Sequence, residues 1–181
     1  MIAGPSGAGK GTVVRQLLDA DPSLWSSLST TTRPPREGDR EGVQYHFVTP
    51  EEFSALQQEG GLLESFEVFG HSYGTPRAPV ERHLRAGDDV VLEIDVQGAL
   101  AVRDAYPDAV LVFVKPPSRA EQRRRLEERG LDDPAEIHRR LEAAEAEEAR
   151  AAVFDAVVVN DDVDRAVAEV AGILAAHRGS G

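Results

Sequence analysis

Short apolar runs alternate with helical patterns along most of this 181-residue chain, and this alternation restricts the fold more than any other feature. The later apolar runs are continuous stretches of Val, Leu, Ile and Phe, as expected of strands buried on both faces. The predicted strands are Met1–Ala3, Leu24–Ser29, Val90–Ile94, Ala109–Val114 and Ala156–Val159. The predicted helices are Lys10–Ala20, Val96–Tyr106, Arg119–Arg129, Pro134–Ala151 and Val163–His177. This order predicts an α/β core, a mainly parallel five-stranded sheet flanked by helices.

The stretch 33–83 departs from the alternation. It contains a predicted helix at Pro50–Glu59, which begins after Thr49 as its N-cap and has proline at its first position. Two half-exposed strands are predicted around this helix: Tyr45–Val48 and Leu62–Val68. We therefore predict a small α+β insertion at 33–83 in a core formed by 1–32 and 84–181.

A glycine-rich segment between the first predicted strand and helix matches the pattern G-x-x-x-x-G-K. Glycines let the backbone fold around a phosphate, so that successive N–H groups face its oxygens. Lys10 supplies a compact ammonium, and Lys115 is the only other lysine among 20 cationic residues. A chance match in a chain of this composition is expected only about 0.015 times. The predicted nucleotide phosphate site comprises Gly4, Pro5, Ser6, Gly7, Ala8, Gly9, Lys10, Gly11 and Thr12.

Two features of this loop are irregular. Gly11 stands where the usual pattern has a hydroxyl that binds Mg²⁺, and Thr12 follows it. The ion is then expected to be held by nucleotide oxygens, water and acidic groups. Only Met1–Ala3 precede the loop, which leaves open whether the start is trimmed or naturally short.

Composition narrows the classes of partner. The formal net charge of −12 disfavours nucleic acids and membranes, since both are polyanions, and an anionic ligand requires cations gathered locally. There is no cysteine, which excludes disulfides and thiolate metal sites. No apolar run approaches a membrane span, and the motif at Gly4 leaves no room for a signal peptide, so the expected location is the cytoplasm. No pattern indicates an oligomeric state.

Arg33 and Arg36 lie three residues apart and are separated by prolines. Such a stiff basic loop suits bidentate contacts with a phosphate. Taken alone, the same pattern is equally typical of a solvated basic turn.

Several segments together resemble the guanylate kinase family and follow its order over nearly the whole chain. They are Ser29–Gly38, Tyr45–Val48, Leu62–Glu64, Tyr73–Thr75, Leu92–Gly98 and Val159–Asp162. The resemblance implies a P-loop enzyme that transfers a phosphoryl group from ATP to GMP, with Mg²⁺ bound with ATP. It implies that the GMP phosphate is held by Arg33, Arg36, Tyr45 and Tyr73, and guanine by Ser29, Glu64, Thr75 and Asp95.

Some of these residues have simpler interpretations. A carboxylate at Glu64 fits guanine, whose N1–H and 2-amino group are adjacent donors, but it could be an ordinary strand-surface carboxylate. Thr75 could cap a helix starting near Pro76. Glu93 is a candidate Mg²⁺ ligand, through water, although the family usually has Asp there. Without the phosphate loop, Glu93 and Asp95 would be interpreted as solvating a strand end.

Seven arginines crowd residues 119–140 in two of the predicted helices, where like charges repel at three- and four-residue spacings. The family resemblance implies a helical lid at about 119–150. In it Arg125, Arg129 and Arg140 converge on the ATP phosphates and act in catalysis with Lys10. Asn160 is expected at the adenine or its ribose, or as a cap of the last helix.

Three other functions are compatible with parts of the pattern. A guanylate-kinase-like module that binds a phosphorylated partner would need neither Lys10 nor the lid arginines. A sugar-phosphate kinase on the same fold would not need Glu64 and Thr75. A regulatory GTPase would need base-recognition and switch motifs that the sequence does not show.

Overall fold

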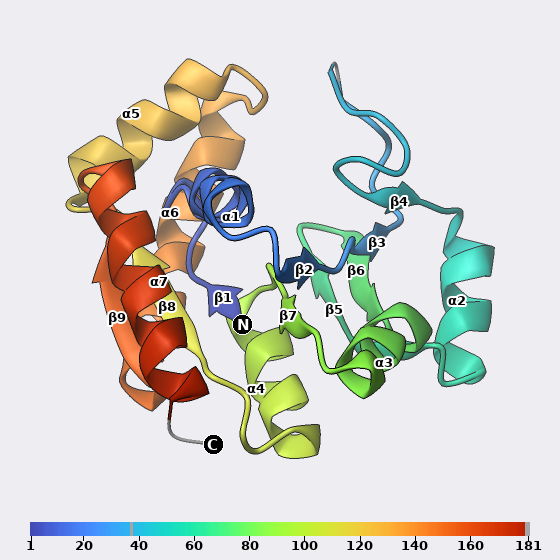
Figure 1. Cartoon of the computed structure of the whole chain (residues 1–181). Coiled ribbons are helices and arrows are strands. Elements are labelled where there is room, and N and C mark those ends of the chain that lie inside the picture. Colours follow the sequence, from blue (N-terminus) through green and yellow to red (C-terminus); the bar gives the residue numbers. More distant parts are fainter. Residues whose placement is uncertain (37, 180–181) are drawn as a thin grey trace. The chain divides into compact units, whose positions relative to one another are not determined.

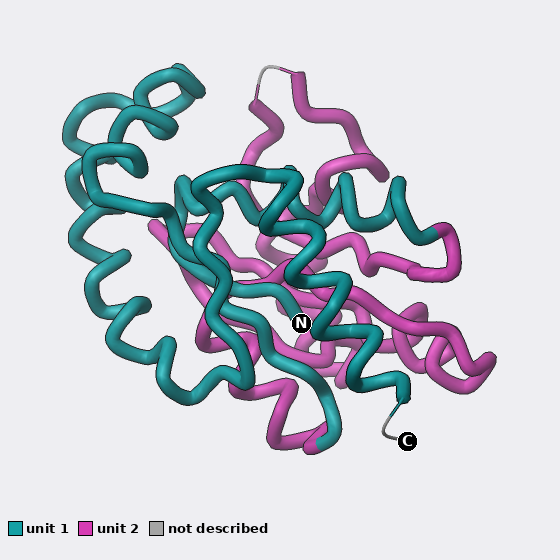
Figure 2. Tube along the Cα trace, turned by 60° about the vertical axis from the view of Figure 1, so that its left-hand side comes forward, with its two compact units in different colours: residues 1–21, 108–181 teal, residues 22–107 magenta. Residues whose placement is uncertain are grey.

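The computed structural model describes residues 1–36 and 38–179 (Figure 1). Glu37, part of the segment that resembles the family's GMP-binding loop, lies outside the described residues. The chain divides into two compact units, one formed by 1–21 with 108–181 and the other by 22–107 (Figure 2). The division into a core and an insertion at 33–83 stays a prediction.

Unit 1 contains a three-stranded parallel sheet in the order β1-β8-β9. Its strands are β1 (Ile2–Ala3), β8 (Val112–Lys115) and β9 (Ala156–Val159). Its helices are α1 (Lys10–Ala20), α5 (Arg119–Arg129), α6 (Pro134–Glu148) and α7 (Val163–Arg178), with a short 3-10 helix, η1 (Ala151–Val153). The central strand β8 is almost wholly apolar because it is paired on both sides and covered on both faces.

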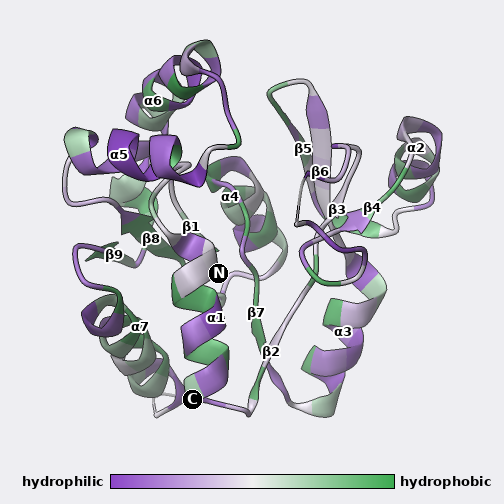
Figure 3. Ribbon diagram, turned by 90° about the horizontal axis from the view of Figure 1, so that it is seen from above, coloured by the Kyte–Doolittle hydropathy of each residue, from purple (hydrophilic) through white to green (hydrophobic). Residues whose placement is uncertain are grey.

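The core of unit 1 follows from helical spacing. Helix α1 buries Val13 and Leu17, and α7 buries Ala166 and Val170, each pair being four residues apart. Both helices alternate between hydrophobic and hydrophilic residues along their length (Figure 3). Phe113 in β8 is fully buried, and its ring meets that of Phe154 edge to face at 5.2 Å. A separate cluster joins the two helices of the predicted lid, α5 and α6: Leu126, Ile137 and Leu141.

Unit 2 contains two sheets. Strands β2 (Leu24–Ser26) and β7 (Asp89–Val91) form a parallel pair. The second sheet has the order β4-β3-β6-β5 and consists of β3 (Thr30–Thr31), β4 (His46–Phe47), β5 (Leu62–Val68) and β6 (His71–Pro76). The helices are α2 (Pro50–Gln58), α3 (Arg77–Ala86) and α4 (Val96–Ala105). Helix α2 begins with a reciprocal capping box between Thr49 and Glu52.

The fold class is confirmed as mixed α/β with parallel strands, while a single five-stranded sheet stays a prediction. All five predicted core strands form, but they pair within a three-stranded and a two-stranded sheet. Sequence reasoning missed β6 and α3, because β6 contains Gly74 and Pro76, while α3 buries a single apolar side chain, Val80. Thr75 lies within β6 and does not cap α3, whose N-cap is Pro76, so that interpretation was wrong.

None of the helices in residues 1–36 and 38–179 combines the length and the apolar content that a membrane span requires.

The packing of unit 1 predicts that alanine substitutions at Phe113 in β8 and Val157 in β9 differ greatly in their effect on stability. Phe113→Ala should lower the free energy of unfolding by about 3–5 kcal/mol, because it removes a fully buried ring and leaves a cavity. Val157→Ala in β9 is the control. Its side chain is 40% exposed, and about 1 kcal/mol or less should be lost. Urea unfolding measures both, and equal losses would contradict the packing described for β8.

Candidate active site

The glycine-rich loop joins β1 to α1 in unit 1, and two of its glycines are required by geometry. Gly4 has φ +142°, and a Cβ there would lie 2.0 Å from the carbonyl oxygen of Val114 in β8. Gly9 is the N-cap of α1 with φ +87°. Helix α1 has no side-chain cap and no acidic residue in its first turn, so its N-terminus suits an anion.

Lys10 begins α1 and its side chain turns back over the loop. Its Nζ donates to the carbonyl oxygens of Gly4 at 2.6 Å and Pro5 at 3.1 Å. Both acceptors are neutral carbonyl oxygens of the loop backbone.

Gln122 in α5 is hydrogen-bonded to the glycine-rich loop. Its Nε2 donates to the carbonyl oxygen of Ser6 at 2.6 Å, and its Oε1 accepts from Arg119 at 2.7 Å. The side chain is fully buried. Sequence reasoning missed this residue, although a signal existed, since Gln122 precedes the buried Leu126 by four residues on the same helix face.

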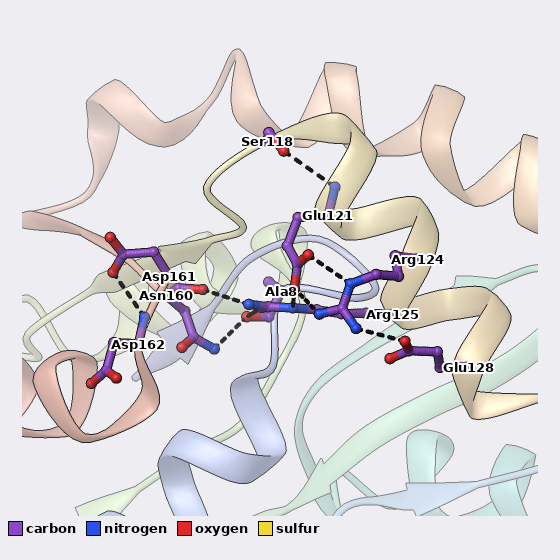
Figure 4. A network of polar contacts seen from close by, with 9 residues as sticks. All are labelled: Ala8, Ser118, Glu121, Arg124, Arg125, Glu128, Asn160, Asp161 and Asp162. Atoms are coloured by element: carbon purple, nitrogen blue, oxygen red, sulfur yellow. Dashed lines mark hydrogen bonds and ion pairs between the residues drawn. The ribbon is translucent and has the colours of Figure 1, made fainter.

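Arg125 and Asn160 meet at the same loop (Figure 4). Arg125 donates through Nη2 to the Asn160 carbonyl oxygen at 2.8 Å, and Asn160 Nδ2 donates to the Ala8 carbonyl oxygen at 2.8 Å. Asn160 is buried, and the cap of α7 is Asp162, which accepts from the N–H of Arg165. The interpretation of Asn160 as a cap of the last helix was therefore wrong.

The other two arginines of the predicted lid share a carboxylate. Asp132, whose side chain is only 1% exposed, accepts from Arg129 Nη2 at 2.7 Å and lies 3.3 Å from Arg140 Nη2. Arg140 also pairs with Glu136 at 3.0 Å and donates through Nη1 to Ser6 Oγ at 3.2 Å. Arg125 and Arg140 thus reach the loop directly, while Arg129 is joined to Arg140 through Asp132.

Glu121 compensates the arginine crowding that the sequence indicated. Hydrogen bonds from Arg124, and then from Arg125, lower the pKa of the Glu121 carboxyl to about 2, so it is ionised at neutral pH (Figure 4). Arg124 also pairs with Glu128 at 2.6 Å on the exposed side of α5. Part of the predicted repulsion is therefore offset within the helix itself.

In unit 2, Arg33 is held in place by a carboxylate and by rings. It is 8% exposed, and its Nη2 donates to Asp39 Oδ2 at 2.8 Å. Its guanidinium carbon lies 5.4 Å from the ring centre of Tyr45 and 5.6 Å from that of Phe47. Burial opposes the ionisation of Asp39, but bonds from the Arg36 N–H and the Arg33 side chain hold the pKa of its carboxyl below the ordinary value.

The predicted phosphate-binding tyrosines lie together. The rings of Tyr45 and Tyr73 meet edge to face at 5.8 Å, and Phe66 stacks on Tyr73 at 6.0 Å. Burial, followed by the negative charge of Glu93, raises the pKa of the Tyr45 hydroxyl to about 12. Tyr45 therefore remains a hydrogen-bond donor at every physiological pH.

Glu64 lies beside an irregularity in the pairing of β5 with β6, between Leu62 and Ser65. Thr75 Oγ1 donates to Glu64 Oε1 at 2.5 Å, and both residues are buried. Glu64 Oε2 has no hydrogen-bond partner in the part of the chain that the structure describes. With Glu64 only 7% exposed, its interpretation as a strand-surface carboxylate was wrong.

The remaining predicted residues also belong to unit 2. Asp95 is the N-cap of α4 and accepts from the N–H of Gly98 at 2.6 Å. Ser29 is half-buried directly before β3, and Glu93 is exposed after β7. Arg36 is half-buried, and its N–H donates to Asp39 at 2.9 Å. Within residues 1–36 and 38–179, no group of three or more His, Cys, Asp or Glu side chains is arranged to hold a metal ion.

Unit 1 contains, in this order along the chain, a strand, a glycine-rich loop and a lysine at the N-terminus of a helix that has no side-chain cap. Together they define a P-loop nucleotide-binding protein.

Comparisons with known proteins narrow this class. The family model described as guanylate kinase matches residues 1–177. The chain is 54% identical over 178 residues to a guanylate kinase of Thermus thermophilus, covering 98% of this chain and 80% of that protein. It is 52% identical to one of Parasynechococcus marenigrum, with 96% of each covered. The crystal structure of guanylate kinase from Anaplasma phagocytophilum matches with a TM-score of 0.81, 34% identity and coverage of 97% of this chain and 82% of that one. The chain belongs to the guanylate kinase family.

Burial of Glu64 predicts an unusual pH dependence of stability. Burial raises the pKa of its carboxyl from 4.5 to about 7; the Thr75 hydrogen bond opposes this rise and the charge of Asp95 adds to it. The native state therefore binds the proton more tightly than the unfolded chain. The resulting stabilisation is complete below pH 4.5 and is lost as the pH rises through 7.

Glu64→Gln removes this titration. Between pH 4.5 and 8 the wild type should lose roughly 3 kcal/mol of unfolding free energy relative to the variant, since each pKa unit is worth about 1.4 kcal/mol. Denaturant unfolding across this pH range measures the difference. The control is Glu67→Gln, at an exposed position of the same strand. A constant difference between wild type and Glu64→Gln would contradict the assigned burial.

Proposed function

We propose that this chain transfers the terminal phosphoryl group of ATP to GMP, giving ADP and GDP. The glycine-rich loop of unit 1 would bind ATP, and the residues around Glu64 and Arg33 in unit 2 would bind GMP. The observation that carries the proposal is the buried Glu64 carboxylate, held by Thr75 at one oxygen and without a described partner at the other. An unsatisfied buried acceptor is costly, and a ligand with suitable donors would remove that cost.

Guanine supplies those donors. Its N1–H and 2-amino group are adjacent, and a carboxylate accepts both, whereas adenine presents an acceptor at N1. Beside Glu64, the pocket would use the hydroxyls of Ser29 and Thr75 and the carboxylate of Asp95 for the rest of the base. The GMP phosphate would replace Asp39 on Arg33 and bind Arg36, Tyr45 and Tyr73.

On the ATP side, the loop backbone and the N-terminus of α1 would hold the phosphates, while Asn160 would lie at the adenine or its ribose. Lys10 would move from its carbonyl acceptors to the transferring phosphoryl group. Arg125 and Arg140 already touch the loop, and Arg129 would follow through its link with Asp132. A helical lid at about 119–150 would carry these arginines over the nucleotide and exclude water.

The transfer needs no general base. A phosphate oxygen of GMP, already anionic, would form the new bond to the terminal phosphorus. The bond from that phosphorus to the bridging oxygen would break, and ADP would leave with the electron pair. In the loose transition state, charge on the equatorial oxygens would be stabilised by Lys10 and the lid arginines.

Magnesium bound with ATP would supply further positive charge at the phosphates. The chain offers few ligands for it, since Gly11 carries no hydroxyl and the described residues contain no acidic cluster for a metal. The ion would therefore be held mainly by phosphate oxygens and water, with the exposed Glu93 reaching it through water.

The rival functions account for less of the structure. A phosphopeptide-binding module gives no reason for Lys10 and two arginines to converge on the glycine-rich loop. A sugar-phosphate kinase gives no reason to bury the Glu64–Thr75 pair.

Base choice tests the proposal most directly. The protein should use GMP with a kcat/KM about 10⁴-fold or more above that for AMP, since adenine would leave buried polar groups unpaired. Glu64→Gln should lose much of this preference while KM for ATP changes little, and Glu67→Gln should behave as wild type. A coupled assay with GMP, AMP, CMP and UMP measures these ratios. Comparable kcat/KM for GMP and AMP in the unmodified protein would refute the guanine pocket.

Lys10→Ala tests the ATP side. We expect kcat to fall about 10²–10³-fold, because a pre-organised charge at the transferring group is lost, while GMP binding is retained. The matched control is Lys115→Ala, which removes the only other lysine. Wild-type turnover in Lys10→Ala would exclude the proposed role of this ammonium.

A further inference from the structure

Gly98 lies in the first turn of α4 and adjoins both carboxylates of the proposed guanine pocket. Its N–H donates to Asp95 Oδ1 at 2.6 Å. A Cβ built on Gly98 would lie 2.8 Å from Glu64 Oε2 and 3.2 Å from Glu64 Cδ. Gly98 therefore holds the Asp95 carboxylate through its N–H, and it leaves room for the Glu64 carboxylate because it has no side chain.

The same Cβ would also lie 3.0 Å from Cε1 of Phe66. Phe66 stacks on Tyr73 with an angle of 12° between the rings, and Tyr73 meets Tyr45. The space at Gly98 is thus limited by Glu64 and by the ring of Phe66.

Backbone conformation does not explain a glycine at this position. Gly98 lies within α4 and is not among the described glycines with positive φ. Glycine inside a helix is less favourable than alanine by up to about 1 kcal/mol. Close approach of another group is the remaining reason for it, and that group is the Glu64 carboxylate.

We propose that Gly98 is a positioning residue that sets where the Glu64 carboxylate lies and thereby determines selectivity for guanine. The inference rests on the proposed function. A methyl group at 98 would displace Glu64 rather than unfold the protein, because the atom closest to it is the end of a flexible side chain. The displaced carboxylate would strain its bond with Thr75 and face guanine poorly.

Gly98→Ala should therefore raise KM for GMP at least tenfold and lower the preference for GMP over AMP, with KM for ATP within twofold of wild type. Gly172→Ala is the matched control, since this glycine lies in α7 and a Cβ there meets no atom within 4 Å. It should leave all three quantities unchanged. Wild-type selectivity in Gly98→Ala would overturn the inference.

A Glu64→Ala background separates positioning from a general structural role. Without the carboxylate, Gly98→Ala should change KM for GMP by less than twofold. Its effect on the melting temperature should reverse sign, lowering Tm in the wild type and raising it in Glu64→Ala, where the closest contact is gone and the gain in helix propensity outweighs the remaining contact with Phe66. A loss of Tm and of GMP use in both backgrounds would show that Gly98 does not act through Glu64.

If the proposed function is wrong, the single variant Glu64→Ala gives a different result. If Glu64→Ala alone leaves the preference for GMP over AMP intact, Glu64 does not recognise guanine and the selectivity part of the inference falls with it. The reversal of the Tm effect would still report whether the two residues compete for the same space.

Discussion

Pairing of arginine with carboxylate is the interaction on which both candidate sites depend. The chain has a net charge of −12, so cations that must meet an anionic ligand have to be kept in place against the surrounding negative charge. Arg33 is held by Asp39, Arg125 by Glu121, and Arg129 and Arg140 by Asp132. Two of these carboxylates, Asp39 and Glu121, have lowered pKa values and stay ionised at neutral pH. Without such partners, a half-buried guanidinium would lose its hydration with nothing in return.

This pairing also limits how tightly a phosphate is held. A phosphate that bound Arg33 as proposed would displace Asp39, so the net gain would be the difference between two charge-assisted interactions and not the whole of one. The arginine is already dehydrated and oriented, which lowers the entropic cost of binding. An enzyme that must release its product benefits from this balance, because contacts that hold both substrate and product tightly lower KM without raising kcat.

The sequence alone was sufficient to predict features that depend on residues close together in the chain. The glycine-rich loop, the start of α2 after Thr49 and the helix at Lys10–Ala20 are of this kind, and all three form as the patterns indicate. Features that join remote segments were missed. Gln122 binds Ser6 across 116 residues, and Asp132 pairs with side chains on two helices. The spacing of Gln122 from Leu126 places it on the buried face of α5 but does not say what it contacts. Only the folded chain shows the partners of Gln122 and Asp132. Strand β6 was missed for another reason, since Gly74 and Pro76 lower its strand propensity while its pairing with β3 and β5 outweighs that cost.

The electrostatics of the proposed base site are opposite to those of the proposed phosphate site at Arg33. Asp39 has partners for its charge, and its carboxyl pKa falls, whereas burial raises the pKa of Glu64, whose Oε2 accepts no hydrogen bond from the described residues. A phosphate exchanges one ionic partner for another, and every nucleotide carries a phosphate, so that exchange cannot discriminate between bases. The Glu64 acceptor is different, because its cost persists until a ligand with correctly placed donors arrives. In the proposed GMP site, affinity for the phosphate and selectivity for the base would therefore have separate physical origins. The proposed role of Gly98 concerns base selectivity, since a Cβ at this position would meet the unsatisfied oxygen of Glu64.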